Sequence, residues 1–111
     1  MIFFVKAGKS MEQVARIEKM EQFLNKSTNI IQEFSDVFER FLQCQEEIEQ
    51  LKQYYGSTEW YEDLEAYDNR QLPKDLRCGV LSEDLIYDML TEYHKLAIQM
   101  LETGTGIMKR Y

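Results

Sequence analysis

The side chains best suited to chemistry are few in this 111-residue chain. His94 is the only histidine, and Thr91 rather than a glutamate stands three residues before it, so the Glu-x-x-His motif of di-iron bundles is absent. Cys44 and Cys78 form neither a Cys-x-x-Cys pair nor a Cys/His spacing suited to zinc. We therefore expect no catalytic residue, no metal site and no cofactor.

Paired carboxylates are the remaining source of acid–base chemistry. Glu62 and Asp63 are adjacent in a segment with helical spacing, where neighbouring side chains point about 100° apart. Two such carboxylates hold a divalent metal only when further ligands converge on it. A metal-dependent hydrolase is therefore the least favoured of the functions considered.

Acidic residues concentrate in one stretch of the chain. Eight of the twenty Asp and Glu residues lie between residues 43 and 68, with Lys52 as the one base, so this stretch carries −7. The remaining twelve acids and twelve bases cancel. Tyrosine and tryptophan rings, which often anchor protein interfaces, alternate with these acids. We predict a protein-binding corner made of Tyr54, Tyr55, Glu59, Trp60, Tyr61, Glu62, Asp63, Glu65 and Tyr67.

This corner supports two functional hypotheses. The first is a non-catalytic interaction or regulatory protein that binds another protein through these residues. The alternative is an acidic nucleic-acid mimic that inhibits a nucleic-acid-binding protein, although mimicry requires acids spread along a groove rather than clustered. In a simpler interpretation the acids are only a solvated face, while Trp60, Leu64 and Tyr67 hold a short helix on the core.

Composition also restricts the compartment and the partners. A net charge of −7 disfavours direct contact with nucleic acid and with anionic membranes. The apolar run at residues 2–5 ends at Lys6, well short of the ~7–15 residues of a secretory segment or the ~20 of a membrane span. Two cysteines make no disulfide scaffold. We expect a cytoplasmic protein.

The elements that must position the corner are helices. A composition of 44% apolar residues with one proline and five glycines is typical of an all-α domain. Between Val14 and Tyr55, apolar side chains repeat every seven residues in three stripes, which predicts a long helix over about 11–55. The polar run 25–29 could divide this helix in two, but the stripes keep their phase across it, so we favour one continuous helix.

Local signals place two further helices. Gly56 followed by Ser57 and Thr58 predicts the start of a short helix over about 58–67. Ser82, as a hydroxyl cap followed by two acids, predicts a C-terminal helix over about 83–103, which Gly104 and Gly106 could end or loosen.

The predicted helices differ in length. The C-terminal helix is too short to cover the apolar face of the long one. We expect an antiparallel helical bundle in which a second copy of the chain, as a homodimer, covers the remainder. The alternative is a long helix that breaks near Asn25 and folds back.

The first ten residues are expected to lie outside this fold. Ser10 and Gln13 fit a capping box, so the helical pattern starts there. This divides the chain into an N-terminal extension, 1–10, and a single helical domain, 11–111, and it makes Met11 a candidate natural start.

Three sequence blocks, Tyr-Tyr-Gly-Ser at 54–57, Trp-Tyr-Glu-Asp at 60–63 and Gly-Val-Leu-Ser-Glu-Asp at 79–84, occur together in this chain. Together they resemble a family of small bacterial helical proteins, of a kind common in Firmicutes, that is classified as a domain of unknown function. The resemblance extends over about Met11 to Leu101. It implies a short cytoplasmic helical protein, and it carries over no activity, cofactor or catalytic residue.

Overall fold

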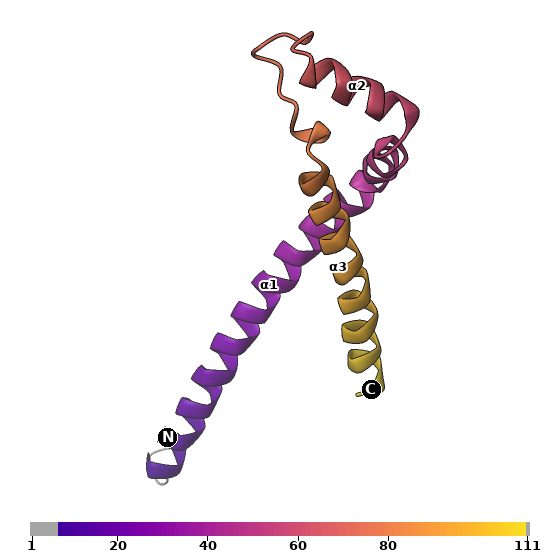
Figure 1. Ribbon diagram of the computed structural model, residues 1–111. Coiled ribbons are helices and arrows are strands. Elements are labelled where there is room, and N and C mark those ends of the chain that lie inside the picture. Colours follow the sequence, from indigo (N-terminus) through magenta and orange to yellow (C-terminus); the bar gives the residue numbers. More distant parts are fainter. Residues whose placement is uncertain (1–6, 111) are drawn as a thin grey trace. The chain divides into compact units, whose positions relative to one another are not determined.

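The computed structural model describes residues 7–110 and is built from helices (Figure 1). Its elements are α1 (Ala7–Tyr54), α2 (Thr58–Asp68), the short 3-10 helix η2 (Gly79–Leu81) and α3 (Glu83–Lys109). No strand occurs among residues 7–110. The all-α prediction and the three predicted helices are confirmed. The described chain divides within α1, after Gln45, into an N-terminal and a C-terminal unit.

The N-terminal unit is the part of α1 that precedes Glu46. The helix is continuous across residues 25–29, as favoured from the phase of the stripes. Its rings stack along the helix axis, with centroids 6.2 Å apart for Phe34 and Phe38 and 6.3 Å apart for Phe38 and Phe41. Such contacts between residues three and four positions apart stabilise a helix locally.

The start of α1 differs from the prediction. The helix begins at Ala7, so Ser10 lies inside it and is not its N-cap. Every helix has the same number of unpaired N–H groups at its start. Starting the helix one turn before Ser10 therefore leaves no additional N–H group unpaired. Residues 1–6 lie outside the described residues, and the proposed boundary at residue 10 and the natural start at Met11 stay predictions.

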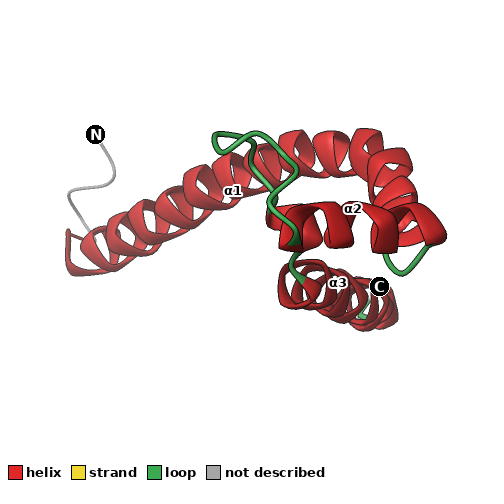
Figure 2. Ribbon diagram, turned by 45° about the horizontal axis from the view of Figure 1, so that its top comes forward, coloured by secondary structure: helices red, strands yellow, loops and turns green. Residues whose placement is uncertain are grey.

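The C-terminal unit contains the end of α1, α2, η2 and α3. A long loop joins α2 to η2 (Figure 2). The buried core of the C-terminal unit consists, among the described residues, of Trp60, Leu81 and Ile86, which are 4%, 7% and 4% exposed. The Trp60 indole Nε1 donates a hydrogen bond of 3.0 Å to the Val80 carbonyl oxygen, which fastens α2 to η2.

The predicted start of α2 is confirmed. Gly56 has a φ of +78°, a left-handed conformation that glycine adopts without strain. The Ser57 hydroxyl then accepts a 3.2 Å hydrogen bond from the Trp60 backbone N–H and caps the helix. These two residues turn the chain after α1 and aim α2 with Trp60 toward the core.

Two details of α3 differ from the predictions. Ser82 occupies the N-cap position, but its hydroxyl makes no capping hydrogen bond, so the favourable first turn rests on the charges of Glu83 and Asp84. Gly104 and Gly106 do not end the helix, which continues to Lys109. A glycine costs a helix only about 1 kcal/mol, and apolar residues on both sides of these glycines maintain the helical pattern.

The C-terminus of α2 is a Schellman motif with an unusual residue in it. The Gln71 N–H donates to the Ala66 carbonyl oxygen at 2.9 Å, and the Arg70 N–H donates to that of Tyr67 at 3.1 Å. The left-handed position of this motif usually carries glycine, but here it carries Arg70 with a φ of +57°. The local backbone therefore holds a residue in a conformation that costs roughly 1–2 kcal/mol.

Replacing Arg70 by glycine is expected to raise the free energy of unfolding by about 0.5–1 kcal/mol, because glycine relieves this strain. Arg70→Ala, which keeps the strain, is the matched control and should be nearly neutral. Urea denaturation followed by circular dichroism measures both. A destabilising effect of Arg70→Gly would show that the arginine side chain itself holds the loop.

Among residues 7–110, no helix combines the length and the apolar composition that crossing a membrane requires.

Candidate protein-binding site

Helix α2 divides the residues predicted for the corner between two faces. Trp60 points into the core, and Leu64 and Ala66 are half-buried. The other side of the helix carries the exposed glutamates Glu59, Glu62 and Glu65 beside Tyr61, which is 60% exposed. Tyr67, 51% exposed, follows Trp60 by seven residues and therefore lies near the same side of the helix as Trp60, at its C-terminal end. We call this exposed set the acidic–aromatic face; it consists of Glu59, Tyr61, Glu62, Glu65 and Tyr67.

Trp60 positions this face from beneath. Its ring meets those of Tyr55 and Tyr61 edge to face, with centroids 5.3 Å and 5.0 Å apart. Edge-to-face pairs of this kind contribute about 0.5–1.5 kcal/mol each beyond their burial. Because Trp60 is only 4% exposed, its ring orients Tyr61 rather than presenting its own surface.

Tyr54 and Asp63 join the end of α1 to α2. The Tyr54 hydroxyl donates a hydrogen bond of 2.5 Å to a carboxylate oxygen of Asp63. This bond, followed by partial burial and the negative charges of Asp63 and Glu59, raises the pKa of Tyr54 from 10.0 to about 12. Asp63 thus forms a hydrogen bond within the chain, and this bond holds α2 against the end of α1.

Alkaline titration should reveal this bond. The protonated Tyr54 hydroxyl is the donor, so its stabilising effect is complete below pH 10 and is lost between about pH 10 and 12. Tyrosinate absorbance should contain one late component near pH 12 that disappears in Tyr54→Phe. In Asp63→Asn, which keeps an acceptor but removes the charge, this component should move toward pH 10. A late component that survives Tyr54→Phe would contradict the assignment.

Tyr55 is half-buried and lies near the start of α3. Burial raises the pKa of Tyr55, and the negative charges of Glu83 and Asp84 raise it further. These two acids of α3 thus extend the negative region beyond residues 43–68. In the sequence, Glu83 and Asp84 indicate only the start of a helix, because they lie outside the acidic stretch and the fold alone brings them near Tyr55.

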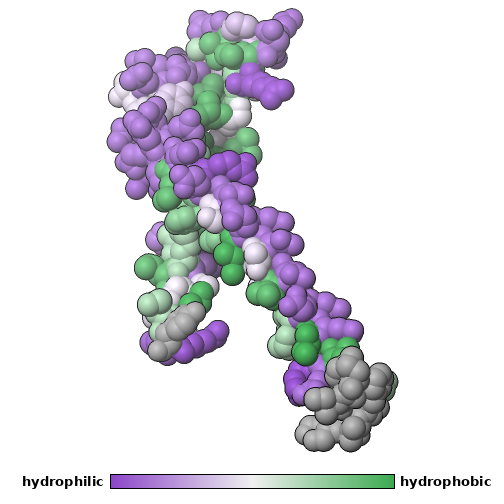
Figure 3. Space-filling model, turned by 180° about the vertical axis from the view of Figure 1, so that it is seen from behind, coloured by the Kyte–Doolittle hydropathy of each residue, from purple (hydrophilic) through white to green (hydrophobic). Residues whose placement is uncertain are grey.

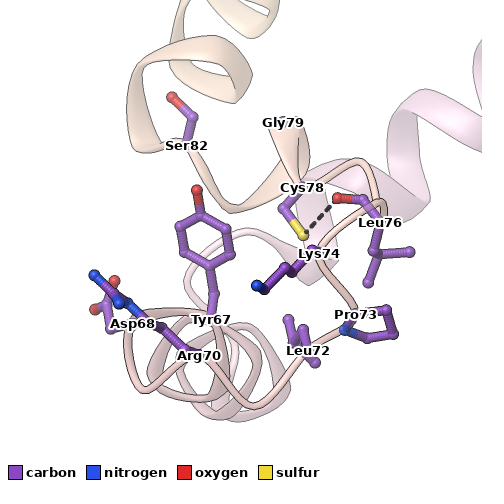
Figure 4. Close-up of a pocket in the computed structure, with 10 residues that line it drawn as sticks. All are labelled: Tyr67, Asp68, Arg70, Leu72, Pro73, Lys74, Leu76, Cys78, Gly79 and Ser82. Carbon is purple, nitrogen blue, oxygen red and sulfur yellow. Dashed lines mark hydrogen bonds between the residues drawn. The ribbon is translucent and has the colours of Figure 1, made fainter.

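The loop after α2 encloses an open cavity of about 790 Å³, which the sequence analysis did not identify. Figure 4 shows the Tyr67 hydroxyl pointing toward Ser82, with the Lys74 side chain reaching into the space between α2 and the loop. Arg70 and Lys74 contribute two positive charges to the lining, and Asp68 contributes one negative charge. The cavity therefore places a basic edge beside the acidic–aromatic face, and Tyr67 belongs to both.

The carboxylates of the site do not gather into a metal site. Within the part of the chain that the structure describes, no three His, Cys, Asp or Glu side chains lie close enough to hold an ion. Both residues of the adjacent pair Glu62 and Asp63 are exposed, and Asp63 accepts the hydrogen bond from the Tyr54 hydroxyl. This arrangement can steer and bind a positively charged surface.

Comparison with known proteins relates the chain to a protein family. Residues 17–103 match the model of a family described as Domain of unknown function (DUF4298). No curated protein and no solved structure shows significant similarity to the chain.

Proposed function

The chain belongs to the DUF4298 family, and we propose that it is a non-catalytic interaction protein of the cytoplasm that binds another protein through the acidic–aromatic face. The partner would present a basic surface, because the face carries three carboxylates and no base. The chain's net negative charge disfavours nucleic acid and anionic membranes as direct partners.

One observation carries this proposal: α2 buries the residue that anchors it and leaves its acids and tyrosines exposed. Trp60 is 4% exposed, whereas Tyr61 and Tyr67 remain 60% and 51% exposed. Exposed tyrosines bring apolar contact area together with a hydrogen-bonding hydroxyl, as at the centres of many interfaces. Carboxylates around them steer a basic partner and set its orientation.

The form of α2 favours a protein partner over mimicry of nucleic acid. The helix has 11 residues and is therefore about 16 Å long. Duplex DNA carries one phosphate charge per ~1.7 Å of its axis, so a helix this short offers few positions that imitate it. Protein recognition needs only a compact patch of rings and charges.

Affinity capture from a lysate of the native host tests the proposal with three forms of the full chain. The test variant carries Glu59→Lys, Glu62→Lys and Glu65→Lys. The matched control carries Glu18→Lys, Asp36→Lys and Glu39→Lys, three exposed acids of α1 that lie away from its apolar stripes. Both variants change the net charge by +6.

A specific partner should be retained by the wild-type chain and the control and lost from the α2 variant, while helical circular dichroism stays unchanged. Capture of the same proteins by all three forms, or of none, would refute binding through this face. A nucleic-acid-binding protein in the specific set would favour the mimic.

A further inference from the structure

The N-terminal unit exposes a long apolar face. Nine large apolar side chains between Ile17 and Phe38 are between 37% and 68% exposed. Figure 3 shows such side chains along one edge of α1 and hydrophilic ones along the other. At roughly half exposed each, they leave on the order of 800 Å² of apolar surface, about what each partner buries in a standard interface. Monomeric proteins rarely expose this much in one patch.

The width of the face sets how many neighbours it needs. Apolar residues occupy three of the seven heptad positions of α1, which is wider than the two-position seam that one neighbouring helix covers. Among the described residues, the longest helix besides α1, with 48 residues, is α3, with 27. One chain therefore has too little helix to cover a face of this length and width.

We propose that a second copy of this chain covers this face, with α1 of one copy packed antiparallel against α1 of the other. The two-fold axis passes near Ser27. In a two-fold dimer the same apolar face of both copies is buried in one interface. No copy of that face is then left exposed to bind a third chain.

The charge along α1 selects the antiparallel orientation. Residues 7–27 contain four bases and three acids, a net charge of +1, whereas residues 28–54 contain six acids and two bases, a net charge of −4. A parallel pair would place the two acidic halves together. An antiparallel pair places each acidic half beside the positive half of the other copy, which lowers the repulsion.

Ser27 supplies the register. The central apolar stripe runs through Met20, Ser27, Phe34 and Phe41, so Ser27 interrupts it with a hydroxyl near the midpoint of the exposed face. A polar residue in such a seam specifies register and orientation because it must meet another polar group. On a two-fold axis, Ser27 meets its own copy.

The same register pairs charges beside the face. Lys19 and Glu33 share one heptad position next to the apolar stripes. With the axis near Ser27, Lys19 of each copy lies opposite position 35 of the other copy. Glu33 of the other copy is only two residues from that position. Opposite charges thus flank the proposed seam on both sides of the axis.

Cysteine cross-linking tests the proposal in the full chain. The background carries Cys44→Ala and Cys78→Ser, and one cysteine is then introduced by Ser27→Cys or by Met20→Cys. Light scattering should give twice the chain mass of 13.3 kDa. Ser27→Cys should form a disulfide between copies under mild oxidation. Met20→Cys should not, because the two cysteines would lie roughly 21 Å apart along the axis, against a limit of about 7 Å.

A monomer at micromolar concentration would overturn the proposal. Equal cross-linking at both positions would show a parallel pair, and a dimer that cross-links at neither would show a different interface; each also overturns it. As a second measurement, Lys19→Glu should weaken the dimer about threefold to tenfold, and adding Glu33→Lys should restore it. None of these changes touches the acidic–aromatic face, so this inference and the proposed function can fail independently.

Discussion

Replacing Trp60 by alanine is expected to lower the free energy of unfolding by about 3–5 kcal/mol. The ring is 4% exposed and is one of three buried apolar side chains in the described part of the chain, so a cavity there has few neighbours that could fill it. The change also removes the donor that satisfies the Val80 carbonyl oxygen. Urea denaturation followed by circular dichroism measures the loss.

Trp60→Phe separates the two contributions. Phenylalanine retains an aromatic ring against Tyr55 and Tyr61 but lacks the Nε1 donor, so we expect a smaller loss of about 1–2 kcal/mol. If Trp60→Ala cost less than about 1 kcal/mol, α2 would not be held by this ring, and the structural basis for the exposed face would be wrong.

The second large effect concerns partner binding. Combining Glu59→Lys, Glu62→Lys and Glu65→Lys is expected to weaken affinity for a captured partner at least about 100-fold, because each reversal replaces an attraction by a repulsion at a basic surface. Isothermal titration calorimetry measures this change. The α1 control variant should change the affinity less than about threefold, since its three changes lie outside the acidic–aromatic face and exposed charges are screened in salt.

Stability serves as the internal control of this experiment. Glu59 lies in the first turn of α2, where a carboxylate favours the helix by about 0.3–1 kcal/mol, so a small decrease in melting temperature is expected. A large decrease would mean that the variant lost its fold rather than its interface. The affinity of such a variant would then be measured again after Glu59 is restored.

Elements defined by neighbours in the sequence were predictable. The heptad stripes locate α1, and Gly56 with Ser57 locates the start of α2, because both signals act within one or two helical turns. The caps predicted at Ser10 and Ser82 were wrong. Each residue is a good capping residue by type, but α1 begins before Ser10 and the Ser82 hydroxyl makes no capping bond. Residue type indicates that a cap is available, not that the backbone uses it.

The site was predictable in composition and in part in orientation. The confined charge and the interleaved rings identified α2, and the simpler interpretation already placed Trp60 on the core, where it is 4% exposed. The binding corner, in contrast, included Trp60, which presents almost no surface to a partner. The cavity beside Tyr67 depends on the path of the loop after α2, and that path begins with the left-handed conformation of Arg70. Nothing about an arginine predicts this conformation, because glycine usually occupies it.

Affinity capture with the wild-type chain, the α2 charge-reversal variant and the α1 control tests directly whether the acidic–aromatic face binds a partner. We expect a partner with a basic surface that the wild-type chain and the control retain equally and that the α2 variant loses while it remains folded. A partner retained equally by all three forms would contradict the claim that the acidic–aromatic face is the binding site.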